Sequence, residues 1–450
     1  MSPKWRPVPF RVNAATALRD PSLRKAMNHA TEIFGKKRSD AFTAKPIEEW
    51  REEASEIRMN VLSGLSQYVD AFAASATKAG AIVYRAADAA LACSIVGNIL
   101  KDRNVRKVVK SKSMVTEEIA LNSHLENLAL EVVETDLGEY IIQLAQEHPS
   151  HIIVPAIHKN RQQVGKLFAS RLHLDYSEDP FALTKMARRI LREHFLTAQA
   201  GISGANFAIS DSGSIILFTN EGNGRMVTTL PPLHIVVVSI EKMLPSLSVL
   251  PKFMRLLPRS ATGQTMTSYM SVISGTRRKD DTTGARELHI VLVDNGRSDI
   301  LKGEFFEILK CIRCGACMNS CPVYRLVGGH AYESTYPGPM GVILTTLLEG
   351  MQKAHPLLDA TTLCGACADV CPVKVPLPMI LRRLREKRHE AGFLPVSERG
   401  AMSLFGLAAG AQSAFHVGQS FSRALWATAS KLSPTLKRMP RPAAQFLRQR

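Results

Sequence analysis

Seven of the eight cysteines lie between Cys311 and Cys371, and their spacing is the feature of the sequence most able to do chemistry. The first motif, C-x2-C-x2-C-x3-C-P, comprises Cys311, Cys314, Cys317 and Cys321, followed by Pro322. The second, C-x2-C-x3-C-P, comprises Cys364, Cys367 and Cys371, followed by Pro372. Closely spaced thiolates that end in Cys-Pro are typical of ferredoxins, where they bind iron-sulfur clusters. The spacing therefore predicts two clusters and a role in electron transfer.

The second motif lacks the leading cysteine of the first, and Thr361 stands in that place. In two-cluster ferredoxins the last cysteine of each motif binds the cluster of the other motif. This crossed pairing assigns Cys311, Cys314, Cys317 and Cys371 to cluster 1. It leaves Cys321, Cys364 and Cys367 for cluster 2, which is one thiolate short. Solvent, a hydroxyl, a carboxylate or substrate could hold its fourth iron, or the centre has only three irons.

Zinc is the alternative metal, since C-x2-C pairs also form tetrahedral zinc sites. A closed zinc site needs four ligands, however, and seven cysteines with two Cys-Pro endings fit two cubane clusters better. Between the motifs, His330 and Glu333 are interpreted as structural groups, with Glu333 kept as a weak candidate near a cluster. The helical patterns around the motifs predict helix termini whose amides bind the sulfurs, and Arg313 and Lys374 add positive charge.

The elements that must position these cysteines can be read from the hydrophobic pattern. Residues 14–76 predict helices. Short β-branched runs then alternate with helical segments: strands are expected at 81–85, 105–111, 130–135 and 151–157, and helices at 87–102, 116–129 and 138–147. Two helices follow within 161–200, then Gly-rich loops between strands over 201–242, an exposed loop at 274–286 and a further strand. The alternation predicts a parallel or mostly parallel sheet with helices on its faces.

Size and charge restrict the protein class. At 450 residues the chain exceeds one hydrophobic core, so two or three domains are expected. The net charge of +17 arises partly from a basic tail, since residues 391–450 hold eight Lys or Arg and only one acid. Without a nucleic-acid motif, a solvated tail, or one that contacts a membrane surface or an electron acceptor, is favoured over nucleic-acid binding. The sequence shows neither a secretory signal nor a long apolar run, so a cytoplasmic protein with reduced thiols is expected, and Cys93 is interpreted as a buried apolar residue.

A candidate anion pocket follows the strand at 105–111. Lys110 and Lys112 precede a helix start, and Arg225 lies in the Gly-rich region, so we expect these three to bind an anionic substrate or cofactor. Solvated loop charge is the alternative interpretation of the same residues. The neighbouring polar residues are Ser111, Ser113, Asn206, Asp211, Ser212, Gly213, Asn220, Glu221, Thr228 and Thr229. His158 and His234 are possible acid-base groups, although packing is the favoured role for each.

With the cysteine motifs placed after the βα region, the chain resembles the lactate-utilisation protein B family over nearly its full length. The resemblance rests on segments 108–119, 133–145, 149–159 and 201–242 and on both cysteine motifs. It implies an α/β lactate-utilisation domain at 70–295, similar in fold to CoA-transferases and ribose-phosphate isomerases. The residue patterns add a helical lead-in at 1–69, an all-helical ferredoxin-type domain at 300–392 and a basic, helical or partly disordered tail at 393–450. By the family resemblance, both cysteine sets are expected to bind clusters. Both centres are then [4Fe-4S] clusters, and Thr361 is usual for the family.

The same resemblance implies an electron-transfer subunit of an L-lactate oxidising system, rather than a complete enzyme. No nicotinamide or flavin fingerprint is present, since GISGANF is not G-x-G-x-x-G at the start of a helix. The implied partners are a cysteine-rich subunit and a second subunit with a lactate-utilisation domain, together with a small 2-hydroxy acid as substrate. The alternatives are oxidation of another 2-hydroxy acid, such as glycolate, and a redox-sensing, anion-binding protein without enzymatic activity.

Overall fold

A computed structural model describes residues 10–394 and 396–410 of the chain. The chain divides into a compact unit, Met1–Leu384, and a second unit, Arg385–Arg450. The first unit begins with helices α1 (Phe10–Ala17), α2 (Pro21–Phe42), α3 (Ile47–Ser63) and α4 (Leu65–Lys78), as predicted. Helix α2 starts where the side chain of Asp20 accepts hydrogen bonds from the backbone amides of Ser22 and Leu23, with Pro21 at the first helical position.

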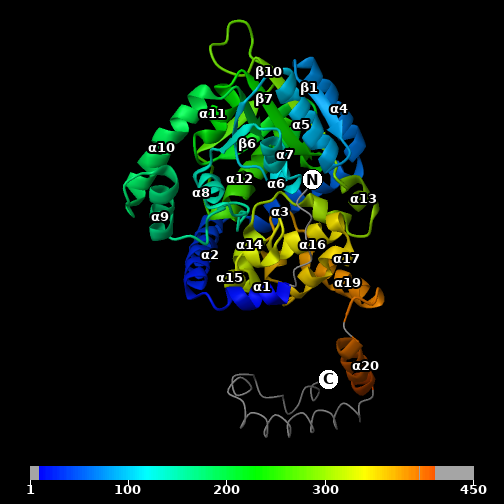
Figure 1. The fold of residues 1–450 in the computed structure, drawn as a ribbon. Coiled ribbons are helices and arrows are strands. Elements are labelled where there is room, and N and C mark those ends of the chain that lie inside the picture. Colours follow the sequence, from blue (N-terminus) through cyan, green and yellow to red (C-terminus); the bar gives the residue numbers. More distant parts are fainter. Residues whose placement is uncertain (1–9, 395, 411–450) are drawn as a thin grey trace. The chain divides into compact units, whose positions relative to one another are not determined.

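A six-stranded parallel sheet forms the centre of the α/β region (Figure 1). Its strands are β1 (Ile82–Ala86), β2 (Lys107–Lys110), β3 (Glu131–Glu134), β4 (Ala200–Ser203), β7 (Leu233–Ser239) and β10 (Glu287–Val293), in the order β1-β10-β7-β4-β2-β3. Every residue of β7 is buried, as expected for a central strand covered on both faces. Ile235 and Val237 pack into one core, and Val236 and Val238 pack into another on the opposite face. The prediction of a mixed α/β region built on a parallel sheet is confirmed.

Helices connect these strands and cover the sheet. They are α5 (Ala89–Asp102), α6 (Met114–Glu118), α7 (Leu121–Asn127), α8 (Leu137–Ala145), α9 (Arg161–Leu172), α10 (Pro180–Thr197) and α11 (Asn223–Thr229). Cys93 on α5 is buried, as predicted. The helix predicted at 116–129 is wrong as a single element, since Ala120 adopts a left-handed φ of 53° and separates α6 from α7.

The strand predicted at 151–157 is also wrong, because this segment forms bends and turns. Within it, Nδ1 of His151 accepts hydrogen bonds from the amides of Ile153 (2.9 Å) and Val154 (3.1 Å). Pro155 has no amide proton to contribute to a sheet. The apolar run therefore packs as a compact loop, with Ile152 and Ile157 buried in the core that surrounds the cysteine motifs.

A smaller four-stranded sheet forms from segments between β4 and β10 of the large sheet. Its strands are β5 (Phe207–Ile209), β6 (Ser214–Thr219), β8 (Met243–Leu244) and β9 (Tyr269–Ile273), in the order β8-β5-β6-β9. Three helical elements lie beside these strands in the chain: η1 (Ile240–Lys242), η2 (Leu247–Val249) and α12 (Leu250–Thr262). Residues 274–286 form a mainly exposed loop before β10, as predicted.

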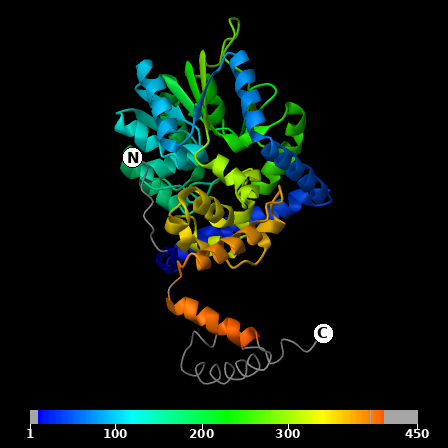
Figure 2. The ribbon, with the colours of Figure 1, turned by 90° about the vertical axis from the view of Figure 1, so that its right-hand side faces the viewer.

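The cysteine motifs lie in a series of short helical elements. These are α13 (Arg297–Lys302), η3 (Phe306–Lys310), α14 (Ala316–Ser320), α15 (Pro322–Val327), η4 (His330–Tyr332), α16 (Gly338–Glu349), α17 (Met351–Ala354), η5 (His355–Asp359), α18 (Ala366–Asp369) and α19 (Leu377–Glu390). Helix α2 packs against α14 and α15, and the two views show the amino-terminal helices beside this segment (Figures 1 and 2). One hydrophobic core includes Met27 of α2, Phe253 of α12 and Tyr324 of α15. The lead-in and the α/β region therefore support the cysteine segment directly.

The second unit contains the described helix α20 (Val396–Gly410). Most of the predicted basic tail, from residue 411 onward, lies outside the described residues. Among the residues that the structure describes, no helix is both long enough and apolar enough to cross a membrane.

Candidate functional site

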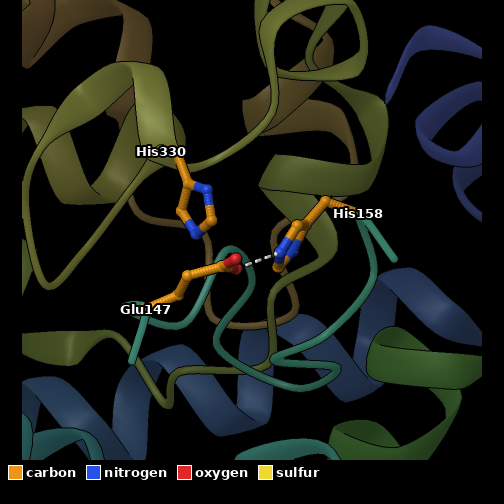
Figure 3. Close-up of side chains that lie close together, drawn as sticks. All are labelled: Glu147, His158 and His330. Atoms are coloured by element: carbon orange, nitrogen blue, oxygen red, sulfur yellow. Dashed lines mark hydrogen bonds and ion pairs between the residues drawn. The ribbon is translucent and has the colours of Figure 1, made fainter. Parts of the chain in front are cut away.

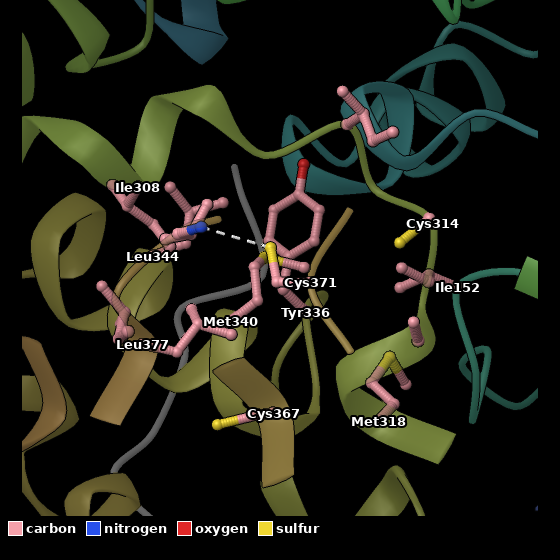
Figure 4. Close-up of a cluster of buried hydrophobic side chains, with 14 of the residues drawn as sticks. Ile152, Ile308, Cys314, Met318, Tyr336, Met340, Leu344, Cys367, Cys371 and Leu377 are labelled. Atoms are coloured by element: carbon pink, nitrogen blue, oxygen red, sulfur yellow. Dashed lines mark hydrogen bonds between the residues drawn. The ribbon is translucent and has the colours of Figure 1, made fainter. Parts of the chain in front are cut away.

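Four cysteines line one cavity in the first unit: Cys311, Cys314, Cys317 and Cys371. Cys314 and Cys371 lie among buried apolar side chains, including that of Met340 (Figure 4). Backbone amides point at the sulfurs, with Arg313 N at 3.4 Å from Sγ of Cys311. Val375 N lies 3.3 Å from Sγ of Cys371. These contacts resemble the amide hydrogen bonds that stabilise cluster thiolates.

The loop of the first cysteine motif packs closely against the segment that contains His151. Gly315 directly precedes α14 and has a φ of 76°, and a Cβ atom there would meet His151 at 3.3 Å and Ile153 at 3.2 Å. A side chain at this position would therefore need both a left-handed backbone and a displaced neighbouring loop. His151 is itself held by Asn319 of α14, whose Oδ1 lies 3.1 Å from Nε2.

Three cysteines line a second cavity: Cys321, Cys364 and Cys367. Thr361 lines the same cavity, and its hydroxyl accepts a hydrogen bond from the amide of Leu363 at 3.1 Å. Cys321 and Cys367 are buried, whereas Cys364 is exposed. The structure thus brings Cys311, Cys314, Cys317 and Cys371 to one cavity and Cys321, Cys364 and Cys367 to the other.

The protonation of these thiols depends on their surroundings. Burial, strengthened by neighbouring sulfurs, raises the pKa of Cys314 and Cys317 above the usual thiol range. Burial also raises the pKa of Cys367 to about 12, whereas the amide of Ala366 lowers that of exposed Cys364. Buried thiols of this kind ionise only with a compensating positive charge, which metal ions supply as they displace the protons. Sulfur donors grouped in apolar cavities, with amides directed at them, therefore fit iron-sulfur clusters.

Arginines of the amino-terminal helices hold the carbonyl groups of the second motif. Arg51 of α3 donates to the carbonyls of Cys371 (2.8 Å) and Ala368 (2.9 Å). Arg38 of α2 donates to the carbonyl of Val370 at 3.3 Å. Sequence reasoning missed this role, because an arginine on an amphipathic helix gives the same pattern when it faces solvent.

Arg58 of α3 is a further residue that the sequence did not single out. Its guanidinium is buried and donates to the carbonyls of Met243 (2.7 Å), Leu309 (2.9 Å) and Lys310 (3.2 Å), and also to that of Glu241. Burial lowers the pKa of Arg58 to about 10, so the group remains charged at pH 7. Arg58 therefore joins the segment after β7 to the residues that precede Cys311.

A cavity of about 370 Å³ lies at the carboxyl ends of the parallel strands. This end of a parallel sheet is the usual place for ligands in α/β proteins. Lys112 follows β2, Asp136 follows β3 and Lys242 follows β7 in its lining, and Asn206, Asn220 and Glu221 contribute from the Gly-rich region. Arg313 and Tyr336 line the same cavity from the cysteine segment.

The cavity combines cationic and acidic groups. Nζ of Lys112 donates to the carbonyl of Ile153 at 2.5 Å. Burial, with a smaller effect of the Arg313 charge, lowers the pKa of Lys242 to about 7. Burial, with a smaller effect of Asp136, raises the pKa of Glu221 to about 7. The lining therefore offers cations for an anionic ligand and a carboxyl group that titrates near neutral pH.

The structure brings only one of the three predicted anion-binding residues, Lys112, to this cavity. Lys110 is fully buried beside it and pairs with Glu134 (2.5 Å) and Glu117 (3.3 Å). Burial by itself would lower the pKa of Lys110, but the charge of Glu134 raises it overall. The ammonium group is therefore protonated, and the carboxylate beside it compensates its charge. Arg225 is exposed on α11, outside the cavity lining. Of the polar residues predicted nearby, Asp211, Ser212, Gly213, Thr228 and Thr229 also lie outside this lining.

The two candidate histidines lie apart from the cavity as well. His234 is buried in β7, and its Nε2 lies 2.8 Å from the hydroxyl of Ser203. Burial lowers the pKa of His234 to about 3, so the ring stays neutral. His158 contacts Glu147 and His330 at another place. The favoured packing role of His234 fits this geometry.

Arg313 lines both the α/β cavity and the cavity of the first four cysteines. Its guanidinium lies 4.9 Å from the centre of the Tyr336 ring and pairs with Glu241 at 3.3 Å. Glu241 pairs in turn with Arg297 (2.7 Å), and the hydroxyl of Tyr336 donates to Glu118 at 2.6 Å. The side chain of Arg313 therefore lies between the two cavities, and a buried network of charged groups holds it there.

Comparison with known proteins assigns these regions. The model of the LUD domain matches residues 69–293, and that of the 4Fe-4S dicluster domain matches residues 307–375. Lactate utilization protein B of Lysinibacillus sphaericus is 46% identical over 403 residues, which cover 89% of this chain and 85% of that protein. The protein of the same name from Bacillus subtilis is 45% identical over 420 residues, with 92% and 87% covered.

Two further matches extend the comparison. An Escherichia coli relative, described as the uncharacterized electron transport protein YkgF, is 43% identical over 409 residues, which cover 91% of this chain and 86% of that protein. A crystal structure of a DUF162 family protein from Deinococcus radiodurans aligns with 51% of this chain and 98% of its own, at 15% identity. Its TM-score of 0.29 is too low to assign a common fold.

The matched dicluster domain and the two groups of cysteines agree on the cofactors, which are two [4Fe-4S] clusters. The likeness to these two relatives covers 89% and 92% of this chain. The chain therefore belongs to the lactate utilization protein B family, in which a LUD domain precedes a ferredoxin-type domain with two [4Fe-4S] clusters.

Proposed function

We propose that this chain is the iron-sulfur electron-transfer component of a multi-subunit system that oxidises L-lactate to pyruvate. The names of its relatives support the lactate assignment, and the dicluster domain supports the electron-transfer role. The partners implied by the family resemblance are a cysteine-rich subunit and a second subunit with a LUD domain.

The cysteine ligands are part of this proposal. Cluster 1 takes Cys311, Cys314, Cys317 and Cys371, which share one cavity. Cluster 2 takes Cys321, Cys364 and Cys367, which share the other. Thr361 lines the cavity proposed for cluster 2, which supports a hydroxyl or solvent oxygen as the fourth ligand.

The domain arrangement is proposed from the same resemblance. A lactate-utilisation domain related in fold to CoA-transferases spans about 70–295, and an all-helical ferredoxin-type domain spans 300–392. The parallel sheet with its covering helices supports the first assignment. The helical elements from α13 to α19 support the second.

One observation carries the functional proposal: the α/β cavity is lined by Arg313, which also lines the cavity of cluster 1. Oxidation of a 2-hydroxy acid to a 2-oxo acid releases two electrons and two protons. Two bound [4Fe-4S] clusters supply two one-electron acceptors for this reaction. A substrate in the α/β cavity is therefore placed next to the first of them.

The side chains around the cavity have distinct roles in this proposal. Lys112, Lys242 and Arg313 attract the carboxylate of the substrate, since cations that line a cavity favour anionic ligands. Glu221 accepts the hydroxyl proton, because a base whose pKa lies near 7 is suited to proton transfer at neutral pH. The second proton, from the α-carbon, passes to solvent as the two electrons pass one to each cluster. Lys110 and Arg225 take no part, because one is paired in the protein interior and the other is exposed elsewhere.

The test uses the cluster-loaded chain with its partner subunits under anaerobic conditions. L-lactate should bleach the visible absorption of the clusters and produce the paramagnetic resonance of two reduced four-iron centres. Lys112→Met and Lys242→Met should each lower kcat/KM for lactate by roughly 10- to 100-fold, as expected for a lost hydrogen bond to a charged group. Arg225→Ala is the matched control and should retain the wild-type rate.

Each alternative gives a different result in the same assay. Reduction of the clusters by glycolate but not by L-lactate would identify another 2-hydroxy acid as the substrate and would leave the proposed substrate site unchanged. A ligand that alters only the affinity for partner subunits, without reducing the clusters, would indicate a sensor and refute the enzymatic role. Normal lactate kinetics in both lysine variants would exclude the cavity as the substrate site.

A further inference from the structure

Three side chains with metal-binding atoms converge away from the cysteines: Glu147, His158 and His330 (Figure 3). Glu147 and His158 belong to the segment between α8 and α9, whereas His330 starts η4 between the two cysteine motifs. One carboxylate oxygen and one nitrogen from each ring lie within 4.8 Å of one another. We propose that these three residues bind one divalent transition-metal ion, zinc by preference, which links the α/β region to the ferredoxin-type segment.

Small side-chain movements bring the three ligand atoms to the spacing of such a site: the Glu147–His158 pair opens, and the other separations, which are within 4.8 Å, close. Oε2 of Glu147 lies 2.8 Å from Nε2 of His158, and the two imidazole rings are 4.4 Å apart at their centres. Ligands at about 2.0–2.1 Å from zinc lie roughly 3.3 Å from one another in a tetrahedral site. Glu147 and His330 are exposed and His158 is half-buried, so the side chains have room to close and one position stays open to water.

The contact of the His330 ring is that of a metal-bound histidine. Nε2 of His330 lies 2.6 Å from the backbone carbonyl of His148 and donates a hydrogen bond to it, which leaves Nδ1 with a free lone pair. A hydrogen bond from the second ring nitrogen to a carbonyl is the usual way in which proteins orient a histidine ligand. Within the described part of the chain, Nδ1 of His158 is buried and has no hydrogen-bond partner.

Both kinds of ligand are available at neutral pH. Burial, with a smaller effect of His330, lowers the pKa of His158 to about 4, so its ring is neutral. Burial opposes ionisation of Glu147, but hydrogen bonds from Lys159 and His158 lower its pKa overall. Two neutral imidazoles and one carboxylate suit zinc, which binds His2Glu sets with a water in the fourth position.

Lys159 competes with the metal ion for the carboxylate. Its Nζ lies 2.6 Å from Oε1 of Glu147. Removal of this cation frees the second carboxylate oxygen and removes a charge that repels the incoming ion. Lys159→Ala should therefore bind zinc more tightly, by up to about fivefold, which is the range for a partly exposed ion pair. A purely structural Glu147–Lys159 pair would give no such gain.

The experiment titrates zinc chloride into the full-length, cluster-loaded chain under anaerobic conditions, after mild chelation that leaves iron and sulfide unchanged. We expect one zinc per chain, and X-ray absorption at the zinc edge should show nitrogen and oxygen ligands at about 2.0–2.1 Å. His330→Gln and Glu147→Gln should each weaken binding at least 10-fold. His29→Gln, which replaces an exposed histidine on α2, is the matched control and should bind as the wild type does.

Three results would overturn the proposal. Sulfur ligands near 2.3 Å would mean that zinc had entered a cysteine site instead. Equal affinity in His330→Gln and His29→Gln would indicate an adventitious ion only, provided that both variants keep their iron, sulfide and circular dichroism. If His330→Gln fails to fold, Lys159→Ala decides the question, and unchanged or weaker zinc binding in that variant would refute the site.

Discussion

The buried ion pair of Lys110 allows a direct test of the distinction between a structural lysine and a ligand-binding one. Lys110 and Glu134 are both almost completely shielded from solvent and lie 2.5 Å apart. Lys110→Met keeps the length of the side chain but leaves the carboxylate without its cation. Removing one partner of a buried pair typically costs about 3–5 kcal/mol, because the remaining charge has lost its compensation.

The expected shift in melting temperature follows from the size of the first unit, Met1–Leu384. An unfolding entropy of about 2.1 cal/mol/K per residue gives roughly 0.8 kcal/mol/K for this unit. A loss of about 3–5 kcal/mol then lowers the melting temperature by about 4–6 °C. Lys112→Met, whose lysine contacts the carbonyl of Ile153 at the cavity, should change it much less and is the matched control.

The deficit should depend on pH in a defined direction. In Lys110→Met, burial raises the pKa of Glu134 above its unfolded value of about 4.3. A raised folded pKa gives stability that is complete below the unfolded pKa and is lost as the pH rises through the folded pKa. The variant should therefore be furthest below the wild type at neutral pH and approach it toward pH 4.5.

The assay is differential scanning calorimetry of both lysine variants and the wild type, at one scan rate and equal cluster content, at pH 7 and pH 5. Lactate-dependent cluster reduction is measured on the same samples. A Lys110→Met protein of wild-type stability that no longer reduced its clusters with lactate would refute the structural role. It would mean that the Lys110–Glu134 pair opens to receive the substrate.

Three other predictions concern the cavity and the clusters. Anion binding by the α/β cavity should weaken as the pH rises through about 7, because Glu221 gains a negative charge and Lys242 loses its positive charge. Glu221→Gln should make this profile shallower in a lactate titration without abolishing it, and an unchanged profile would exclude Glu221. Arg51→Met should destabilise the second cysteine motif by about 1–3 kcal/mol, since two carbonyls lose a charged donor. This variant should release iron to a chelator faster than the control variant Arg225→Ala does. Equal rates would contradict the role of Arg51. Thr361→Cys should complete a four-cysteine set at the second cavity and slow the loss of cluster 2 in air, which the paramagnetic resonance of the oxidised three-iron centre measures. Thr362→Cys, in the same cavity lining, is the control. Equal protection in both variants would argue against position 361 as the fourth ligand.

Local patterns in the sequence were sufficient to predict most of the helices and strands. The βα alternation predicted the parallel sheet, because alternation of this kind reflects burial of strands on both faces. Ferredoxin spacing predicted the division of seven cysteines that the two cavities display, because ligand spacing within a loop is set by the cluster itself.

Features that depend on distant contacts could not be predicted in this way. Lys110 and Lys112 are equivalent as charges in the sequence, and only the fold directs one into the interior and the other to the cavity. The 151–157 segment reads as a strand by composition, yet its backbone is held by the side chain of His151. Arg58 and Arg313 act through partners that lie far away in the chain, and no local pattern distinguishes them from solvated arginines.

The hydrogen bonds of Arg51 have a consequence for biogenesis. Its carbonyl partner at Cys371 is synthesised 320 residues later, so α3 cannot complete its contacts until nearly the whole first unit has left the ribosome. Cofactor insertion and closure of the amino-terminal helices are therefore late, linked events in maturation. Limited proteolysis should cut α2 and α3 rapidly in the cofactor-free chain and slowly after reconstitution, whereas equal cutting would show that the two events are independent.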